Sequence, residues 1–158
     1  EQFERALFIW VRRDPVFNIQ SALEARKRQY GDINNWYSFK IKQYPQLKDL
    51  GPLESVAGQI AAINLSISSG MSGLASRNKL IVQYEDFCKN PEFYYKGIIE
   101  QMTDCDFKNV ANQRYQGESD FSNTNLWRLK EYSENEVHNA YMKFVSIFSE
   151  EKANVTDF

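Results

Sequence analysis

The sequence predicts an α/β fold in which helices flank a parallel sheet. Two short apolar runs, residues 6–11 (ALFIWV) and 79–84 (KLIVQY), are rich in β-branched and aromatic side chains, as in strands that are covered on both faces. Each run is followed by polar residues and then by a proline, Pro15 or Pro91, that suits the first position of a helix. This alternation of strand and helix is typical of a parallel sheet with helical crossovers.

The end of the first predicted strand has the features of a phosphate site. Asp14 is expected to cap a helix that begins at Pro15 and ends before Gly31, which can adopt the left-handed conformation beyond a helix end. Arg12 and Arg13 precede the cap. They are expected to lie beside the amide donors of the helix N-terminus, where hydrogen bonding and the helix dipole both favour an anion.

Basic and aromatic residues follow this helix start. Residues 26–28 (RKR) come near the predicted end of the helix, where their charges complement the helix dipole. Their expected role is therefore capping and solubility, and contact with a substrate or phosphate group is the alternative.

Residues 32–52 are polar and aromatic without a clear period. A loop of this length in a small domain is either functional or poorly ordered.

Three further helices are predicted. The helix over residues 53–69 has apolar side chains at steps of three and four: Leu53, Val56, Ile60, Ile63 and Ile67. Another begins after Asn90 and is expected to bury Phe93, Tyr94, Ile98, Ile99 and Met102. In the last helix Ser133 and Glu136 form a capping box. Its expected buried face consists of Val137, Tyr141, Phe144 and Phe148. His138 lies off this face, so we expect it to be exposed.

Two of these motifs resemble those of the sulfotransferases that use 3′-phosphoadenosine-5′-phosphosulfate (PAPS). Residues 11–15 (VRRDP), with Ser21 in the following helix, are similar to the segment with which this family binds the 3′-phosphate of its cofactor. Residues 79–87 (KLIVQYEDF) are similar to a later strand of the family that ends in Tyr-Glu-Asp. The resemblance implies that Arg13 and Ser21 hold the 3′-phosphate and that Tyr84 approaches the adenine.

The resemblance extends to a late segment and to the central loop. Residues 122–128 (SNTNLWR) look like a variant of a family segment that folds over the cofactor, which implies contacts from Trp127 and Arg128. A glycine-arginine pair that is common there in the family is replaced by asparagine and leucine. Arg128, Lys130 or Arg114 could therefore supply the basic contact, or none of them.

The central loop is expected either to contact the acceptor or simply to pack on the surface. Residues 36–40 (WYSFK) look like a stretch of some bacterial family members, in which the corresponding region lies over the acceptor pocket. This likeness favours a cytoplasmic enzyme, whereas a eukaryotic member would be expected in the Golgi lumen.

The resemblance implies a sulfotransferase with a three-layer sheet like that of P-loop NTPases. It would transfer a sulfuryl group from PAPS to a hydroxyl or amine of a small-molecule or carbohydrate acceptor. Residues 1–158 are expected to be one domain, the C-terminal portion of a larger enzyme, because the family's lysine-containing 5′-phosphosulfate loop and its general base are not found in this chain. Two alternatives stay open, namely a P-loop-type nucleotide kinase and a non-catalytic α/β interaction domain. A homo-oligomer is also compatible with the sequence.

Composition limits the classes of partner. The net charge of −2 over 158 residues argues against non-specific nucleic-acid binding, which usually requires a strongly basic domain. No apolar run approaches the roughly 20 residues that a membrane span requires. Cys88 and Cys105 have no metal-binding spacing and do not establish an oxidising compartment, so no metal site is expected.

Overall fold

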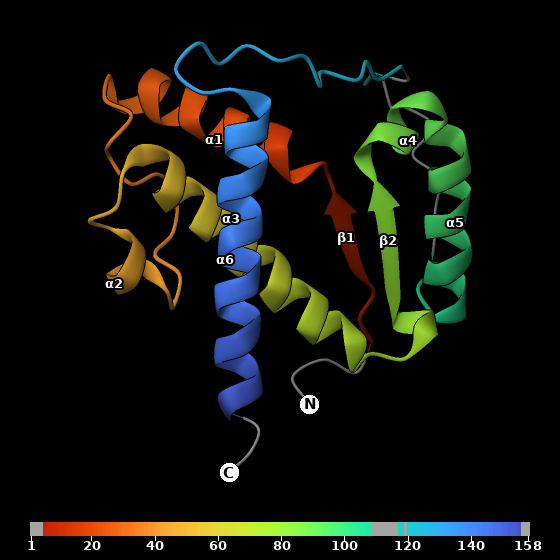
Figure 1. Cartoon of the computed structure of the whole chain (residues 1–158). Helices are drawn as coiled ribbons and strands as arrows, with labels where there is room; N and C mark the ends of the chain where they lie inside the picture. Colours follow the sequence, from red (N-terminus) through yellow and green to blue (C-terminus); the bar gives the residue numbers. More distant parts are fainter. Residues whose placement is uncertain (1–4, 109–116, 119, 156–158) are drawn as a thin grey trace. The chain divides into compact units, whose positions relative to one another are not determined.

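Two sets of residues pack separately in the computed structural model of the chain, which describes residues 5–108, 117, 118 and 120–155 (Figure 1). Residues up to Arg13 and from Gly70 to Thr124 form one unit, which contains both strands and is called the strand unit below. Residues from Asp14 to Ser69 and from Asn125 onwards form the other unit, called the helical unit.

The strand unit contains a parallel pair of strands. Strand β1 (Phe8–Arg12) and strand β2 (Lys79–Gln83) pair along their full lengths, from Phe8 opposite Lys79 to Arg12 opposite Gln83. Figure 1 shows the two arrows side by side and pointing the same way. The parallel pairing expected from the two apolar runs is therefore confirmed.

Coverage of β1 on both faces is not found. Val11 is 60% exposed, and Phe8 and Ile9 are also exposed. The physical reason is that β1 has a single neighbouring strand among the described residues, so one backbone edge and much of its apolar surface have no cover from a wider sheet. Composition alone predicts a buried strand here, but burial depends on what packs against the strand.

Short helices complete the strand unit. The 3₁₀-helix η1 (Ser76–Asn78) precedes β2, and the side-chain Nδ2 of Asn78 donates a hydrogen bond to the carbonyl of Ala6 at 2.8 Å, which joins the segments before the two strands. Helices α4 (Tyr84–Lys89) and α5 (Pro91–Asp104) follow β2. Helix α5 begins after Asn90 as predicted, and the Asn90 side chain caps it by accepting a hydrogen bond from the Phe93 amide at 3.1 Å.

The expected buried face of α5 is only partly correct. Phe93 is 66% exposed, whereas the other members of that face, Tyr94, Ile98, Ile99 and Met102, are half-buried. No residue of α5 is fully buried. The helix therefore covers β2 with a narrower apolar surface than its sequence period suggests.

The helical unit is built from helices α1 (Pro15–Tyr30), α2 (Tyr44–Leu47), α3 (Pro52–Ser72) and α6 (Glu134–Val155), the last turn of α3 being grouped with the strand unit. Its core is apolar and joins all four helices; the fully buried members are Val16, Ile19, Leu23, Leu47, Val56, Ala57, Ala61, Ala62, Val137, Phe144 and Phe148. The predicted face of α6 is thus confirmed, with Tyr141 half-buried beside it, and His138 is exposed.

Local capping signals fix where the helices of this unit begin and end. Asp14 Oδ1 accepts a hydrogen bond from the Val16 amide at 2.9 Å, and Gly31 closes α1 in the left-handed conformation with φ of 70°. Before α6, the amide of Ser133 donates to Glu136 Oε2 at 2.7 Å, and the amide of Glu136 donates back to Ser133 Oγ at 3.3 Å. The predicted caps of both helices are confirmed.

Over the residues that the structure describes, the fold class is mixed α/β, mostly helical, with a small two-stranded parallel sheet. Among the residues that the structure describes, no helix is both long and apolar enough to cross a membrane.

Candidate functional site

Two of the residues singled out by the sequence meet at one edge of the sheet. Arg13 directly follows β1, and Tyr84 directly follows β2 as the first residue of α4. Because Arg12 and Gln83 are opposite each other in the parallel register, both strands end at the same level. The guanidinium carbon of Arg13 consequently lies 4.9 Å from the centre of the Tyr84 ring. The carboxyl ends of parallel strands are where open α/β sheets bind their ligands.

A third residue, Thr124, joins this pair. Its hydroxyl accepts a hydrogen bond from Arg13 Nη2 at 3.4 Å and lies 3.0 Å from the hydroxyl of Tyr84. Its amide also donates to the Tyr84 hydroxyl at 3.3 Å. The sequence placed Thr124 inside the late segment expected near the cofactor but gave it no role, because a threonine in an irregular stretch carries no pattern of its own.

The residues just before Thr124 are held against α4. The ring of Phe121 packs on that of Phe87 with centroids 4.9 Å apart, and the Tyr84 hydroxyl lies 3.4 Å from the carbonyl oxygen of Ser122. The cluster of Arg13, Tyr84 and Thr124 thus lies wholly within the strand unit and is called the strand-end cluster below. It combines one cation, one aromatic face and two hydroxyls, which is suitable for binding an anionic group attached to a ring.

Arg12 does not take part in this cluster. Its guanidinium carbon lies 5.0 Å from the centre of the ring of Trp10, a residue on the same face of β1. The reason is the two-residue repeat of a strand, which puts Trp10 and Arg12 side by side and Arg13 beyond the last pairing position.

The other singled-out residues belong to the helical unit. Ser21 is half-buried on α1, and Trp127 packs against the helical core. The guanidinium of Arg128 binds both carboxylate oxygens of Glu24, each at 2.9 Å, and these hydrogen bonds raise the pKa of Arg128 above its ordinary value. Arg128 is therefore already engaged by a carboxylate, which weakens its candidacy as a phosphate ligand.

Gln20 holds the segment of Arg128 to α1. Its Nε2 donates to the Leu126 carbonyl at 2.8 Å, and its Oε1 accepts from the Arg128 amide at 2.7 Å. The Gln20 side chain is fully buried, and the two hydrogen bonds are themselves part-buried. No sequence pattern indicates this role, since a glutamine inside an amphipathic helix is ordinarily a surface residue. The alternative basic residue Arg114 lies outside the described residues, and Lys130 is exposed.

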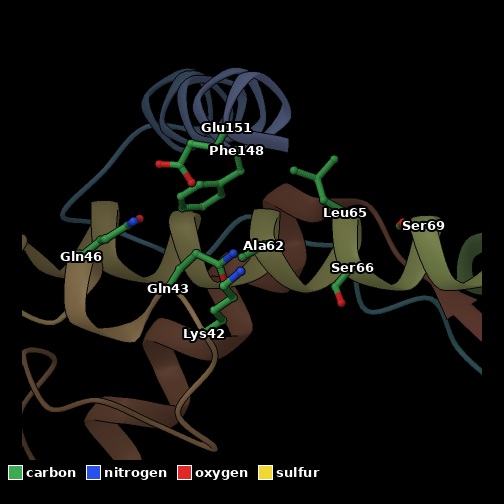
Figure 2. Close-up of a pocket in the computed structure, with 9 residues that line it drawn as sticks. All are labelled: Lys42, Gln43, Gln46, Ala62, Leu65, Ser66, Ser69, Phe148 and Glu151. Carbon is green, nitrogen blue, oxygen red and sulfur yellow. The ribbon is translucent and has the colours of Figure 1, made fainter. Parts of the chain in front are cut away.

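The helical unit also contains an open cavity of about 390 Å³ (Figure 2). Figure 2 shows Phe148 and Glu151 extending from α6 towards α3, with Lys42 and Gln43 approaching from the loop before α2. The complete lining is Lys42, Gln43, Gln46, Ala62, Leu65, Ser66, Ser69, Phe148 and Glu151. Part of the loop over residues 32–52 therefore does line a cavity, which is the kind of position expected for acceptor contact. Whether an acceptor binds there stays a prediction.

Among the described residues, no group of histidine, cysteine and carboxylate side chains is arranged to bind a metal ion. Cys105 is buried, and its thiol donates to the Arg77 carbonyl at 3.0 Å.

Comparisons with models of known protein families, with curated proteins and with solved structures found no match. The assignment of a function therefore depends on the residues and their geometry.

Proposed function

We propose that this chain is a PAPS-dependent sulfotransferase domain whose strand-end cluster binds the adenosine 3′,5′-bisphosphate portion of the cofactor. The observation that carries the proposal is the contact between Arg13 and Tyr84 at the shared carboxyl edge of β1 and β2. These are the residues that the sequence resemblance assigns, from two distant motifs, to the 3′-phosphate and the adenine.

The chemistry of the cluster suits this ligand. Arg13 offers a planar fork of N–H donors that can bind two phosphate oxygens at once, and the aromatic face of Tyr84 can stack on a purine. The Tyr84 ring and the Thr124 hydroxyl orient the guanidinium, which lowers the conformational entropy lost on binding. The role that the resemblance gives to Ser21 stays a prediction.

The reaction follows from the cofactor. An acceptor oxygen or nitrogen attacks the sulfur of PAPS, the new bond to sulfur forms as the sulfur–oxygen bond to the phosphate breaks, and the acceptor loses its proton. The bisphosphate leaves with its negative charge. Such a transfer asks the protein mainly for positioning and for positive charge around the leaving group. Arg13 would hold the 3′-phosphate, away from the breaking bond, and so contributes to positioning; we assign no residue as general base.

The proposal includes a wider sheet with helices on both faces. It is supported by the apolar side chains that β1 and β2 expose, since Phe8, Ile9, Val11 and Ile81 are each more than 40% exposed. Further parallel strands and their crossover helices would cover this surface. A two-stranded sheet alone is only marginally stable in water.

The first test is a thermal-shift titration with adenosine 3′,5′-bisphosphate, beside ATP with Mg²⁺ and adenosine 2′,5′-bisphosphate. A ligand that binds only the native state raises the melting temperature. We expect a shift with the 3′,5′-isomer that exceeds the shifts with the other two nucleotides. A larger shift with ATP and Mg²⁺ would favour a kinase, and no shift with the 3′,5′-isomer would contradict the proposal.

Two arginine variants locate the site. Each charge-assisted hydrogen bond contributes about 1.5–3 kcal/mol, so Arg13→Ala is expected to weaken bisphosphate binding by about tenfold to a hundredfold. Arg12→Ala is the matched control, because Arg12 is the neighbouring residue and contacts Trp10 instead of Tyr84. Equal losses in the two variants would overturn the assignment to Arg13.

A further inference from the structure

The helical unit buries an arginine in its interior. Arg26 lies on α1, where the basic run over residues 26–28 was expected to serve capping and solubility, but its side chain is only 1% exposed. It is enclosed by Ser55 of α3 and by Ile33 and Trp36 of the loop that follows α1. A buried charge costs several kcal/mol unless it is paired and hydrogen-bonded, so this position requires a specific explanation.

One side of the Arg26 guanidinium is satisfied. Nη1 donates to Ser55 Oγ at 2.8 Å and to the Ile33 carbonyl at 3.4 Å. Ser55 is oriented to accept, because its own hydroxyl donates to the Pro52 carbonyl at 3.1 Å. These contacts fix the plane of the guanidinium between α3 and the loop.

The other side is not satisfied. Nε and Nη2 of Arg26 are buried and have no hydrogen-bond partner among the described residues. Together these two nitrogens form one edge of the guanidinium, the edge that donates two parallel hydrogen bonds to a carboxylate in bidentate pairs. The Trp36 ring, whose centre lies 5.5 Å from the guanidinium carbon, offers a cation–π contact but no acceptor for either N–H group.

Negative charge to balance Arg26 does not come from the described carboxylates around it. Five carboxylates of the helical unit are engaged with other groups: Glu24, Asp32, Asp49, Glu54 and Glu131. Burial without a counter-charge lowers the pKa of Arg26 from its ordinary value. Arginine nevertheless stays protonated in proteins, so the charge persists, and an anion is the partner that would both accept these hydrogen bonds and balance the charge.

We propose that Arg26 is the receptor for a carboxylate-bearing small ligand, whose two oxygens accept hydrogen bonds from Nε and Nη2. A monoanion balances the single buried charge, whereas a dianion would leave an uncompensated charge in the same apolar surroundings. Ile33 and Trp36 both belong to the loop between α1 and α2, so the ligand enters by a local displacement of that loop. The site is independent of the proposed nucleotide site.

The test observes the Nε–H group directly. In ¹H–¹⁵N NMR spectra, we expect one arginine Nε–H signal to move downfield and saturate as sodium formate is added, and not to move with sodium chloride at the same ionic strength. Arg26→Lys should remove this signal, which assigns it. Absence of movement with formate, or equal movement with chloride, would overturn the proposal. A stronger response to sulfate than to formate would overturn the choice of a carboxylate.

Thermal stability provides the second readout. Formate should raise the melting temperature of the wild-type protein and of the control Arg28→Lys, whose residue is exposed on the same helix. Its binding to Arg26→Lys should be at least about tenfold weaker, since lysine lacks the bidentate edge. Retained binding in Arg26→Lys would contradict the inference. If that variant does not fold, the wild-type titration, with the signal assigned by through-bond correlations, decides the question.

Discussion

The guanidinium of Arg13 lies against the face of Tyr84, with its carbon 4.9 Å from the ring centre. This contact joins two residues that are far apart in the sequence, because parallel pairing of β1 and β2 brings the residues after both strands to one edge. The same edge holds Thr124, whose hydroxyl contacts both side chains. The cluster can therefore be tested one interaction at a time.

Tyr84→Leu is expected to weaken the binding of adenosine 3′,5′-bisphosphate. It removes the ring that orients Arg13, and a cation–π contact at an exposed site contributes about 0.5–1 kcal/mol, so the loss should be about twofold to fivefold. Tyr84→Phe is the matched control, because it keeps the ring and removes only the hydroxyl that contacts Thr124. Isothermal titration calorimetry should show affinity close to wild type for Tyr84→Phe. Equal affinities of the Phe and Leu variants would contradict a role for the ring.

The elements that sequence predicts well are those determined by neighbouring residues. The caps at Asp14 and Ser133 depend on hydrogen bonds that span two or three residues, so the local pattern determines them. The helix predicted over residues 53–69 is likewise confirmed and extends to Ser72, since its apolar period needs only one covered face. Parallel pairing of the strands follows from the long helical connection between them.

The features that the sequence does not predict depend on tertiary packing between distant segments. The aromatic character of Phe93 suggests burial, but the residue is 66% exposed on α5. Conversely, Arg26 sits in a basic run that resembles an exposed helix end and is buried by the loop containing Trp36. Thr124 belongs to the strand-end cluster through tertiary contacts alone. Such positions are decided by packing between distant segments, which composition and period do not encode.

Gln20→Leu should destabilise the helical unit by about 2–3 kcal/mol. Gln20 is buried and hydrogen-bonds the Leu126 carbonyl and the Arg128 amide, and the leucine would leave both backbone groups without their partner. Urea denaturation followed by tryptophan fluorescence measures the loss. Asn18→Leu on the same helix is the control, and it should change the free energy of unfolding much less. A Gln20 variant as stable as that control would show that the two hydrogen bonds contribute little.

Gly58→Ala is expected to cost about 1–3 kcal/mol, because α3 approaches Leu47 of α2 at this glycine. A β-carbon at residue 58 would overlap the end of the Leu47 side chain, which is buried and has little room to move. Gly70→Ala is the matched control on the same helix, since nothing lies near its added methyl group, and it should be neutral or stabilising by up to about 1 kcal/mol.

A double-mutant cycle identifies the cause of the Gly58 effect. If overlap with Leu47 is responsible, Gly58→Ala should cost much less in the background of Leu47→Ala than in the wild type, because the clashing methyl groups are gone. Denaturation midpoints of the four proteins give this coupling. Additive losses would mean that the alanine destabilises α3 for another reason.

The capping box before α6 should make stability depend on pH through Glu136. Hydrogen bonds from the backbone amide and the hydroxyl of Ser133 lower the pKa of Glu136 from its ordinary value of 4.5. A carboxyl group with a depressed folded-state pKa contributes stability above its unfolded pKa and loses it as the pH falls through the folded value. The difference in melting temperature between wild type and Ser133→Ala should therefore be largest above about pH 5 and should shrink towards about pH 3.

In parallel, the NMR titration midpoint of the Glu136 carboxyl carbon should lie below the ordinary value in the wild type and rise in Ser133→Ala. A difference that grows on acidification, or an unchanged midpoint, would show that the Ser133 hydroxyl does not hold Glu136 in its ionised form.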